Sequence, residues 1–377
     1  MNNLKKQAAQ IRWKNWEYWS SKAFYFPMWV WGPWLALRSG HPCFFTAANP
    51  GIFTGGMGFE SKIQTILKIP EVYRPKTILA PAATPFELIL VEMSAAGIGF
   101  PVIAKPDLGF RGFLVQKIDS PQALQTYLKQ YPADFIIQEF VWKEGEFGIL
   151  YHRFPGAQSG HITSVTLKEF LSITGDGQST VLELIERHPR ALLQMERLQN
   201  TYGHLFSKIP EQGEQIPLGV IGNHSKGTKF ISGNQLINKE LIAVFDDIAN
   251  QIPGFNYGRF DIKCGSWGHL LQGKDITILE INGVCSEPTH IYDPQRSSYW
   301  EALYEIMRHW SIIRRIAAAN HRLGTPYLKP GEMLRTIYQS LKSMKQLEKR
   351  ATISQSESFI PKQARYEHGY FKSRGAQ

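Results

Sequence analysis

The sequence is short of cysteine and has no long hydrophobic run. Its three cysteines, Cys43, Cys264 and Cys285, form no CxxC pair, which argues against a disulfide framework and against a structural zinc site. The apolar stretch at residues 23–37 is interrupted by two prolines and a glycine, whereas a membrane-spanning helix needs about 20 apolar residues in succession. We therefore expect a protein of a reducing, cytoplasmic setting that does not span a membrane.

Acidic residues are scarce at the two ends of the chain and common in its middle. The formal net charge is +5 over residues 1–40, +7 over residues 322–377 and −2 over the remainder, which gives +10 for all 377 residues. Because the excess of positive charge lies at the two ends and not in the body of the chain, it argues against a nucleic-acid groove across the fold. The hydrophobic fraction of 43% and the charged fraction of 20% are ordinary, and the length predicts two or three structural units.

Tryptophan is abundant near the N-terminus, where six of the ten lie between residues 13 and 34. Two interpretations stay open for Trp13, Trp16 and Trp19, which recur at helical spacing. They pack on the body or on a second subunit of a homodimer, or they lie on an anionic membrane surface beside the neighbouring lysines and arginines. Residues 333–350 combine basic side chains with one apolar helical face, a pattern that favours peripheral membrane association.

Strand-like and helix-like runs alternate beyond residue 80. The pattern predicts strands at 101–106, 113–118, 134–141, 146–154, 161–170, 257–264 and 276–282. It predicts helices at 84–97 with Thr84 as N-cap, at 120–131, from about Thr180 onward, and at 297–324. Hairpins mixed with helices indicate an α+β fold in which helices cover antiparallel sheets.

Two stretches have residues suited to a nucleotide. In "VIAKPDLGFRGFLV", Lys105 ends an apolar strand, and the glycines of the next loop let backbone N–H groups approach an anion. In "FIIQEFVWKEGEF", Gln138 and Glu139 precede Glu146 by a short linker, an order that suits a purine ring and ribose hydroxyls. Each stretch alone is also compatible with an ordinary turn or an exposed strand edge.

A pair of strands predicts a metal site. In "GRFDIKC" and "LEING", Asp261 and Glu280 lie on the polar faces of two strands joined by a short hairpin, so we expect them to face each other. Two carboxylates with the Asn282 amide, without Cys or His, fit a hard cation such as Mg²⁺ with bound phosphates. The alternative is a surface ladder in which Arg259 and Lys263 neutralise the acids.

These motifs, in this order, resemble the ATP-grasp superfamily over about residues 84–295. "LEINGVCSEPTHIYDP" is similar to a motif of D-alanine:D-alanine ligases, and "KEFLSITGDGQSTVLELI" to a segment of cyanophycin synthetases and bifunctional glutathione synthetases. The resemblance implies an ATP-grasp fold, in which two α+β lobes hold ATP between antiparallel sheets. It also implies an ADP-forming carboxylate–amine or carboxylate–thiol ligase that acts through an acylphosphate, with ATP and Mg²⁺ or Mn²⁺.

The resemblance further assigns roles to individual residues. The ATP phosphates would be bound by Lys105, Lys168 and the loop with Gly109, Arg111 and Gly112; the adenine by Gln138, Glu139, Phe140 and Val141; and the ribose by Glu146. Mg²⁺ would be ligated by Asp261, Glu280 and Asn282, and the reacting groups stabilised by Arg259, Lys168 and the Gly283 amide. Candidates for the acceptor are Ser286, Glu287 and His290, with a structural role as the alternative for His290.

The expected organisation has five parts: an aromatic basic segment (1–40), a reduced N-terminal region (41–83), the ATP-grasp domain (84–295), C-terminal helices (296–350) and a basic, flexible tail (351–377). The glycine-rich residues 44–62 are either a long structural loop or a cover for the substrate. The expected partners are a small-molecule carboxylate and an amine, without nucleic acid. Two other functions stay open: an ATP-grasp kinase that phosphorylates a small-molecule hydroxyl, and a membrane-surface nucleotide-binding module without turnover.

Overall fold

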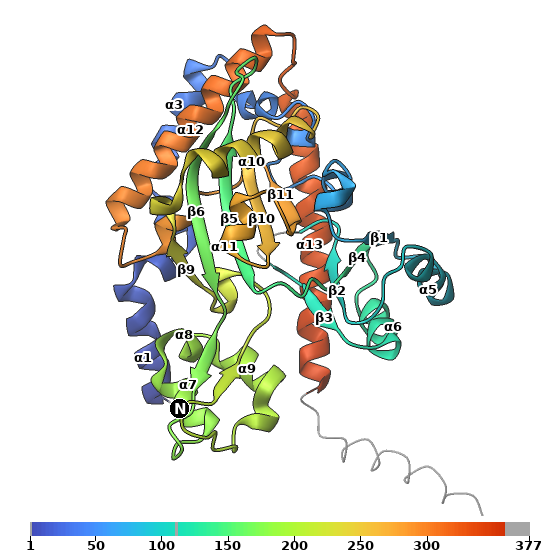
Figure 1. Cartoon of the computed structure of the whole chain (residues 1–377), viewed down its shortest axis with the longest axis vertical. Coiled ribbons are helices and arrows are strands. Elements are labelled where there is room, and N and C mark those ends of the chain that lie inside the picture. Colours follow the sequence, from blue (N-terminus) through green and yellow to red (C-terminus); the bar gives the residue numbers. More distant parts are fainter. Residues whose placement is uncertain (1, 110–111, 359–377) are drawn as a thin grey trace, which may run out of the picture.

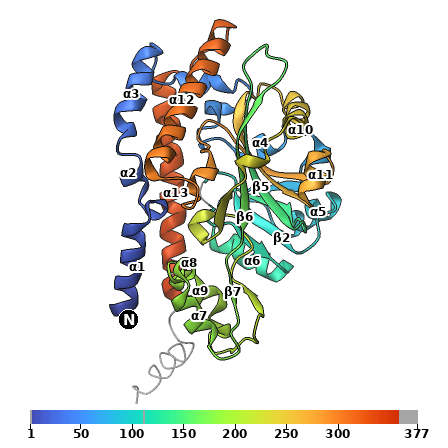
Figure 2. The same cartoon turned by 60° about the vertical axis from the view of Figure 1, so that its left-hand side comes forward.

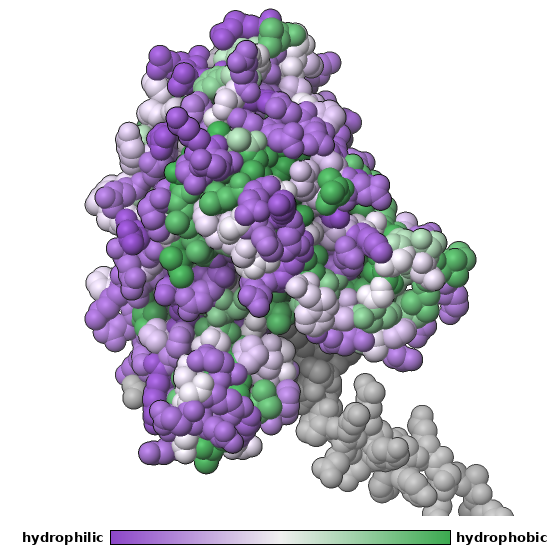
Figure 3. Space-filling model, viewed as in Figure 1, coloured by the Kyte–Doolittle hydropathy of each residue, from purple (hydrophilic) through white to green (hydrophobic). Residues whose placement is uncertain are grey.

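Two antiparallel β-sheets, each backed by helices, form the two lobes of the molecule (Figure 1). The computed structural model describes residues 2–109 and 112–358. Hydrophilic side chains cover most of the face seen in Figure 3, and hydrophobic ones show between them in small groups. The α+β fold expected from the alternating pattern is confirmed.

The smaller sheet has the strand order β1-β4-β2-β3. Its strands are β1 (Thr77–Ala80), β2 (Val102–Pro106), β3 (Gln116–Ile118) and β4 (Phe135–Glu139), and its helices are α5 (Phe86–Ala95) and α6 (Pro121–Gln130). Val102, Ala104 and Ile137 are buried in one core with Leu124 of α6. Because side chains alternate along a strand, Lys105 and Gln138 lie on the opposite face of this sheet.

The larger sheet has the strand order β11-β10-β5-β6-β9. Its strands are β5 (Gly145–His152), β6 (His161–Glu169), β9 (Lys229–Ser232), β10 (Tyr257–Cys264) and β11 (Ile276–Asn282). Ile149, Phe260 and Ile262 pack on one face against α10 (Lys239–Asn250) and α11 (Trp267–Leu271). The other face has apolar residues at one end and charged residues at the other, and the charged end belongs to the site described below.

A small helical unit is inserted between β6 and β9. It contains a two-stranded sheet of β7 (Ser172–Thr174) and β8 (Gln215–Pro217), with α7 (Val181–Arg187), α8 (Pro189–Leu192) and α9 (Met195–Tyr202). Thr180 is the N-cap of α7. Its hydroxyl accepts a hydrogen bond from the Glu183 backbone N–H, and the Glu183 carboxylate accepts one from the Thr180 backbone N–H, so the predicted start of this helix is confirmed.

α3 (Met28–Arg38) packs against α12 (Tyr299–Arg322), and α1 (Asn2–Lys14) contacts α8 of the inserted unit, so these helices follow one side of the molecule (Figure 2). The remaining helices are α2 (Ser21–Phe24), α4 (Lys62–Ile66) and α13 (Pro330–Ser358), and the short α4 lies near β1 and β11. Met333 and Met344 of α13 are buried and Leu347 joins the core of the smaller lobe, so this apolar helix face is used in packing. No helix in the described part of the chain is long and apolar enough to cross a membrane.

The predicted and observed boundaries of the elements agree best where apolar and polar residues alternate strictly. β10 and β11 occupy the predicted ranges 257–264 and 276–282. The strand predicted at 113–118 is shortened to β3, because Gly112 (φ 69°) and Leu114 (φ 52°) turn the chain before it. The helix predicted from Thr84 begins at Phe86 with Pro85 at the N-cap position, so the assignment of Thr84 as N-cap was wrong.

Candidate active site

A cavity of about 840 Å³ lies between the two sheets. The predicted site residues that line it are Lys105, Gly109, Gly112, Gln138, Glu139, Phe140, Val141, Glu146, Lys168, Arg259, Asp261, Glu280, Asn282, Ser286 and Glu287. Gly283 and His290 are not among its lining residues, and Arg111 lies outside the described residues. Residues from both lobes, far apart in the sequence, therefore meet in one cavity.

The predicted carboxylate pair lies at the centre of this cavity. β10 and β11 pair in antiparallel register with Asp261 opposite Glu280, as the hairpin argument predicts. Asn282 Nδ2 donates to Asp261 Oδ2 (2.9 Å) and to Glu280 Oε1 (2.8 Å), so one amide joins the two acids. Gly148 on β5 keeps the space beside Asp261 open, since a Cβ there would lie 3.6 Å from Asp261 Oδ1 and 3.3 Å from the Thr289 hydroxyl.

Two cations hold Asp261 in its ionised form. Lys168 Nζ lies 2.9 Å from Asp261 Oδ1 and 2.9 Å from Glu146 Oε1, and Arg259 Nη2 lies 2.8 Å from Asp261 Oδ2. Burial alone would raise the pKa of Asp261, but Arg259 and Lys168 outweigh it and hold this pKa well below its usual range. Burial would likewise lower the pKa of Lys168, but Asp261 and Glu146 raise it instead. Asp261, Lys168 and Arg259 are thus charged at neutral pH.

Lys105 is different, because no carboxylate of the described residues lies within ion-pair distance of it. Its side chain is only 5% exposed, and Nζ donates to Gln138 Oε1 (3.3 Å) and Leu279 O (3.4 Å). Burial lowers its pKa, and Glu280 opposes this shift only in part. A buried ammonium group without a close counter-ion is costly, so this part of the cavity favours an anion.

Lys62 lies beside this position, although the sequence analysis gave it no role. Its Nζ donates to Asp107 O (3.3 Å) and to Gly109 O, and burial lowers its pKa as well. Lys62 ends the glycine-rich residues 44–62, and this segment packs on the end of β11, where a Cβ on Gly56 would lie 2.5 Å from Gly283 Cα. The only sequence signal for Lys62 is its place at the end of this segment.

The strand end and linker after β4 form another wall. Lys263 Nζ donates to Val141 O (3.2 Å), and the Phe140 ring lies 5.2 Å from Lys117 Nζ and 5.5 Å from Lys263 Nζ. Glu139 accepts a hydrogen bond from the Lys76 backbone N–H (2.9 Å). These contacts fix the backbone of residues 139–141 as a rigid edge of the cavity.

Two glycine-containing loops meet over the ion pairs. A Cβ on Gly112 would lie 2.7 Å from Asn223 Nδ2, and Lys226 Nζ donates to Val115 O (3.1 Å). A Cβ on Gly222 would lie 1.9 Å from Glu146 Oε1, so only glycine lets this backbone pass so close to the Glu146–Lys168 pair. Gly222 was not identified from the sequence, where it is one of several glycines in a loop.

The three residues predicted to act on the acceptor, Ser286, Glu287 and His290, differ in their hydrogen bonds and burial. Glu287 accepts hydrogen bonds from the Tyr25 and Tyr292 hydroxyls, and burial raises its pKa. The Ser286 hydroxyl donates to Gly283 O within a tight turn. His290 is buried with Nδ1 2.8 Å from the Ser164 hydroxyl, and burial lowers its pKa to about 4, so its position outside the cavity fits the structural alternative.

The aromatic N-terminal segment closes the cavity, which the sequence did not predict. Trp16 stacks on Phe24 at 5.6 Å, and Glu17 Oε2 lies 2.7 Å from Arg190 Nη2 and 2.9 Å from His224 Nε2. Burial would raise the pKa of Glu17, but the contacts with His224 and Arg190 lower it. Trp16 thus follows the packing interpretation, with Trp19 near Tyr299 at 5.1 Å, whereas the Trp13 side chain is 78% exposed.

No protein-family model matches the sequence, and no curated protein matches it. Many solved structures align with the fold, among them the three that follow. A D-Ala:D-Ser ligase from Enterococcus faecalis has a TM-score of 0.40 at 13% identity, over 71% of this chain and 64% of that protein. A D-alanine–D-alanine ligase from Bacillus anthracis has a TM-score of 0.40 at 12% identity, over 73% and 72%.

A bifunctional glutathione synthetase from Pasteurella multocida has a TM-score of 0.37 at 15% identity, over 67% of this chain and 35% of that protein. The aligned region therefore spans less than two thirds of the Enterococcus and Pasteurella proteins. These are enzymes of the kinds that the motifs resemble. At such scores the likeness assigns no chemistry, which has to come from the geometry of the cavity.

Proposed function

We propose that this protein is an ATP-dependent ligase that joins a small-molecule carboxylate to an amine through an acylphosphate. The observation that carries the proposal is the buried ammonium of Lys105, which has no carboxylate of the described residues within ion-pair distance, in the same cavity as the Asp261–Glu280 pair. The phosphates of a triphosphate would be the counter-ions of Lys105 and Lys62. A divalent cation would bind the carboxylates of Asp261 and Glu280. Mg·ATP meets both requirements at once.

The nucleotide would lie along the wall formed by β2 and β4. Residues 138–141 offer backbone groups at the cavity edge for adenine, and Glu146, which lines the same cavity, would bind the ribose hydroxyls. Lys105, Lys168 and the loop with Gly109 and Gly112 would contact the phosphates. Since Lys168 Nζ lies 2.9 Å from Glu146 Oε1, ATP binding would exchange this ion pair for contacts with phosphate and ribose.

Asp261, Glu280 and Asn282 have the oxygen donors that Mg²⁺ or Mn²⁺ prefers. In the described part of the chain, no group of three or more His, Cys, Asp or Glu side chains is arranged to hold a metal. The residues therefore fit a cation held by two carboxylates with phosphate oxygens and water, and not an all-protein cage. When bound, the cation would neutralise charge on the phosphates.

The chemistry would proceed in two displacements. A carboxylate oxygen of the substrate attacks the γ-phosphorus, the bond to the β–γ bridging oxygen breaks, and ADP leaves the acylphosphate behind. The amine then attacks the acyl carbon, the C–O bond to phosphate breaks, and the nitrogen loses a proton. Lys105 and Lys168 stabilise the first step, and Arg259 stabilises the oxyanion of the second. Glu287, with its raised pKa, is the candidate base.

A substrate screen that reads ADP release tests the proposal, with amino acids, dipeptides and polyamines offered in pairs. Asp261→Asn should lower turnover at least about 100-fold with the fold intact, because it removes a metal ligand and the anchor of Lys168 and Arg259. The matched control is Asp275→Asn in the exposed hairpin turn between β10 and β11, where Asp275 binds only peripheral groups. Unchanged turnover in Asp261→Asn would refute the metal assignment, and a phosphorylated alcohol as product would show a kinase.

A further inference from the structure

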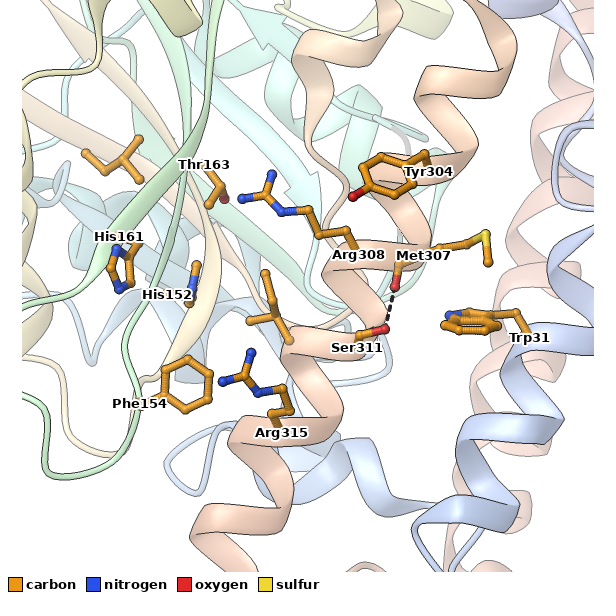
Figure 4. Close-up of a pocket in the computed structure, with 12 residues that line it drawn as sticks. Trp31, His152, Phe154, His161, Thr163, Tyr304, Met307, Arg308, Ser311 and Arg315 are labelled. Carbon is orange, nitrogen blue, oxygen red and sulfur yellow. Dashed lines mark hydrogen bonds between the residues drawn. The ribbon is translucent and has the colours of Figure 1, made fainter.

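A second pocket, of about 670 Å³, lies away from the first and shares no lining residue with it. It is formed by the far ends of β5 and β6 and by α12, with Trp31 of α3 at its edge (Figure 4). Arg308 and Arg315 extend from α12 toward the strands that carry His152 and Thr163. Nothing in the chemistry proposed above uses this pocket.

The pocket is cationic. Arg308 and Arg315 line it, and no Asp or Glu is among its lining residues. Arg308 Nη1 is 3.1 Å from Glu305 Oε2, a contact along α12, whereas the Arg315 guanidinium lies 4.9 Å from the centre of the Phe154 ring and has no carboxylate within ion-pair distance among the described residues. One positive charge at least is therefore uncompensated.

Three polar atoms of the residues that line this pocket are buried without a hydrogen-bond partner among the described residues. These are Nδ1 of His152, a residue only 5% exposed, the hydroxyl of Thr163 and Nε1 of Trp31. Buried polar groups are nearly always paired, and leaving one unpaired costs about 1–3 kcal/mol. Burial lowers the pKa of His152 to about 4, and the neighbouring His161, Arg308 and Arg315 add to this shift.

We propose that this pocket binds a phosphate monoester with an apolar body. The phosphate group carries nearly two negative charges at neutral pH, which match the two arginines, and its oxygens have more acceptor sites than a carboxylate for the hydroxyl and imidazole nearby. Phe154, Ile162 and Ile312 supply the apolar part of the lining. The ester is either a small soluble molecule or the head group of a lipid.

Calorimetric titration with phenyl phosphate and with dihexanoyl phosphatidic acid below its aggregation concentration separates these two sources. Arg315→Gln should weaken binding at least about tenfold, since a charged hydrogen bond is lost, and Thr163→Val should weaken it less. Arg314→Gln is the matched control, because Arg314 is on the same helix but outside the pocket. Binding of both ligands indicates a soluble ester, and binding of the phosphatidic acid alone indicates a lipid.

Equal affinities in the unmodified protein, Arg315→Gln and Arg314→Gln would overturn the proposal, since the phosphate would then bind in the first cavity. Absence of binding would overturn it too. Benzoate is the control for the ligand, and an affinity equal to that of phenyl phosphate would contradict the charge matching.

A separate observation concerns the outer face of α3 and the residues just before it. Phe26, Trp29, Val30, Trp34 and Leu37 are between 40% and 81% exposed and follow one another at helical spacing. Met28 and Leu35, on the inner face, are buried. In the part of the chain that the structure describes, nothing covers this outer apolar face.

Charge indicates what covers this face. No Asp or Glu occurs between residues 18 and 59, and Lys22 and Arg38 are exposed at the two ends of the stripe. We infer that α3 lies flat on an anionic lipid surface, with indole rings at the interface and the cations toward the head groups. This places the membrane contact on α3, whereas Trp16 is used in packing.

Sedimentation with vesicles of phosphatidylcholine and phosphatidylglycerol tests this contact. Trp29→Ser with Leu37→Ser should reduce the bound fraction several-fold, while Val72→Ser, at a 77% exposed site outside the stripe, should not. Unchanged binding would refute the inference. So would a dimer that dissociates in the double variant, because a second copy would then cover the stripe.

Discussion

At the scale of single residues, the site depends on close contacts around the Glu146–Lys168 pair. Gly222→Ala would place a methyl group where Glu146 Oε1 lies, at a distance of 1.9 Å, and would push this carboxylate away from Lys168. We expect ATP to bind at least about tenfold more weakly and the free energy of unfolding to fall by about 1–3 kcal/mol. Gly219→Ala is the control in the same loop, because nothing lies within 4 Å of its Cβ position. Equal nucleotide titrations for the two variants would contradict this account of the loop.

His309 makes stability depend on pH. Burial, with His152, Arg308 and His290 nearby, lowers the pKa of His309 to about 3, whereas a histidine of the unfolded chain has a pKa of about 6.5. The unfolded chain therefore binds a proton first, so the contribution of His309 is fully present above pH 6.5 and is lost as the pH falls toward 3.

Denaturant unfolding at pH 7 and at pH 4.5 measures this contribution. The unmodified protein should lose about 2–3 kcal/mol more between these values than His309→Asn, while the carboxylates titrate alike in both. Parallel stability curves for the two proteins would show that His309 is not buried in its neutral form.

At the scale of elements, the N-terminal turn Trp16–Tyr18 connects the chain end to the inserted helical unit. Glu17→Gln would leave Arg190 without its buried counter-ion and would change the contact between Glu17 Oε2 and His224 Nε2. We expect a loss of about 2–4 kcal/mol in the free energy of unfolding, and little change for Glu71→Gln on an exposed turn. If the free energy of unfolding falls no more in Glu17→Gln than in Glu71→Gln, the contact does not hold the N-terminal turn against the inserted helical unit.

The same elements show what the sequence can and cannot predict. Strict alternation and a short hairpin determine the register of β10 and β11, which is why Asp261 and Glu280 were expected to face each other and do. Glu17 and Arg190 are 173 residues apart, and neither belongs to a periodic pattern, so only tertiary packing brings them together. Lys62 and Gly222 were missed for the same reason, since Lys62 begins the short helix α4, Gly222 lies in a loop, and only tertiary packing brings either residue to the cavity.

At the scale of the whole molecule, two sheets from different parts of the chain bring cations and acids into one cavity. Lys105 comes from the smaller lobe, whereas Asp261, Glu280 and Lys168 come from the larger one. A nucleotide between the lobes would contact both sets. The phosphate pocket and the α3 stripe lie apart from this cavity, so their tests are independent of the proposed reaction.

Hydroxylamine trapping is the most direct test of the ligase claim, because it needs no knowledge of the amine. The protein would be incubated with Mg·ATP, hydroxylamine and pools of candidate carboxylates, and hydroxamate would be measured against ADP. An acylphosphate intermediate predicts hydroxamate in proportion to ADP for one pool, reduced at least about 100-fold in Asp261→Asn and unchanged in Asp275→Asn. ADP release without hydroxamate for every pool, with a phosphorylated hydroxyl compound as product, would contradict the ligase account.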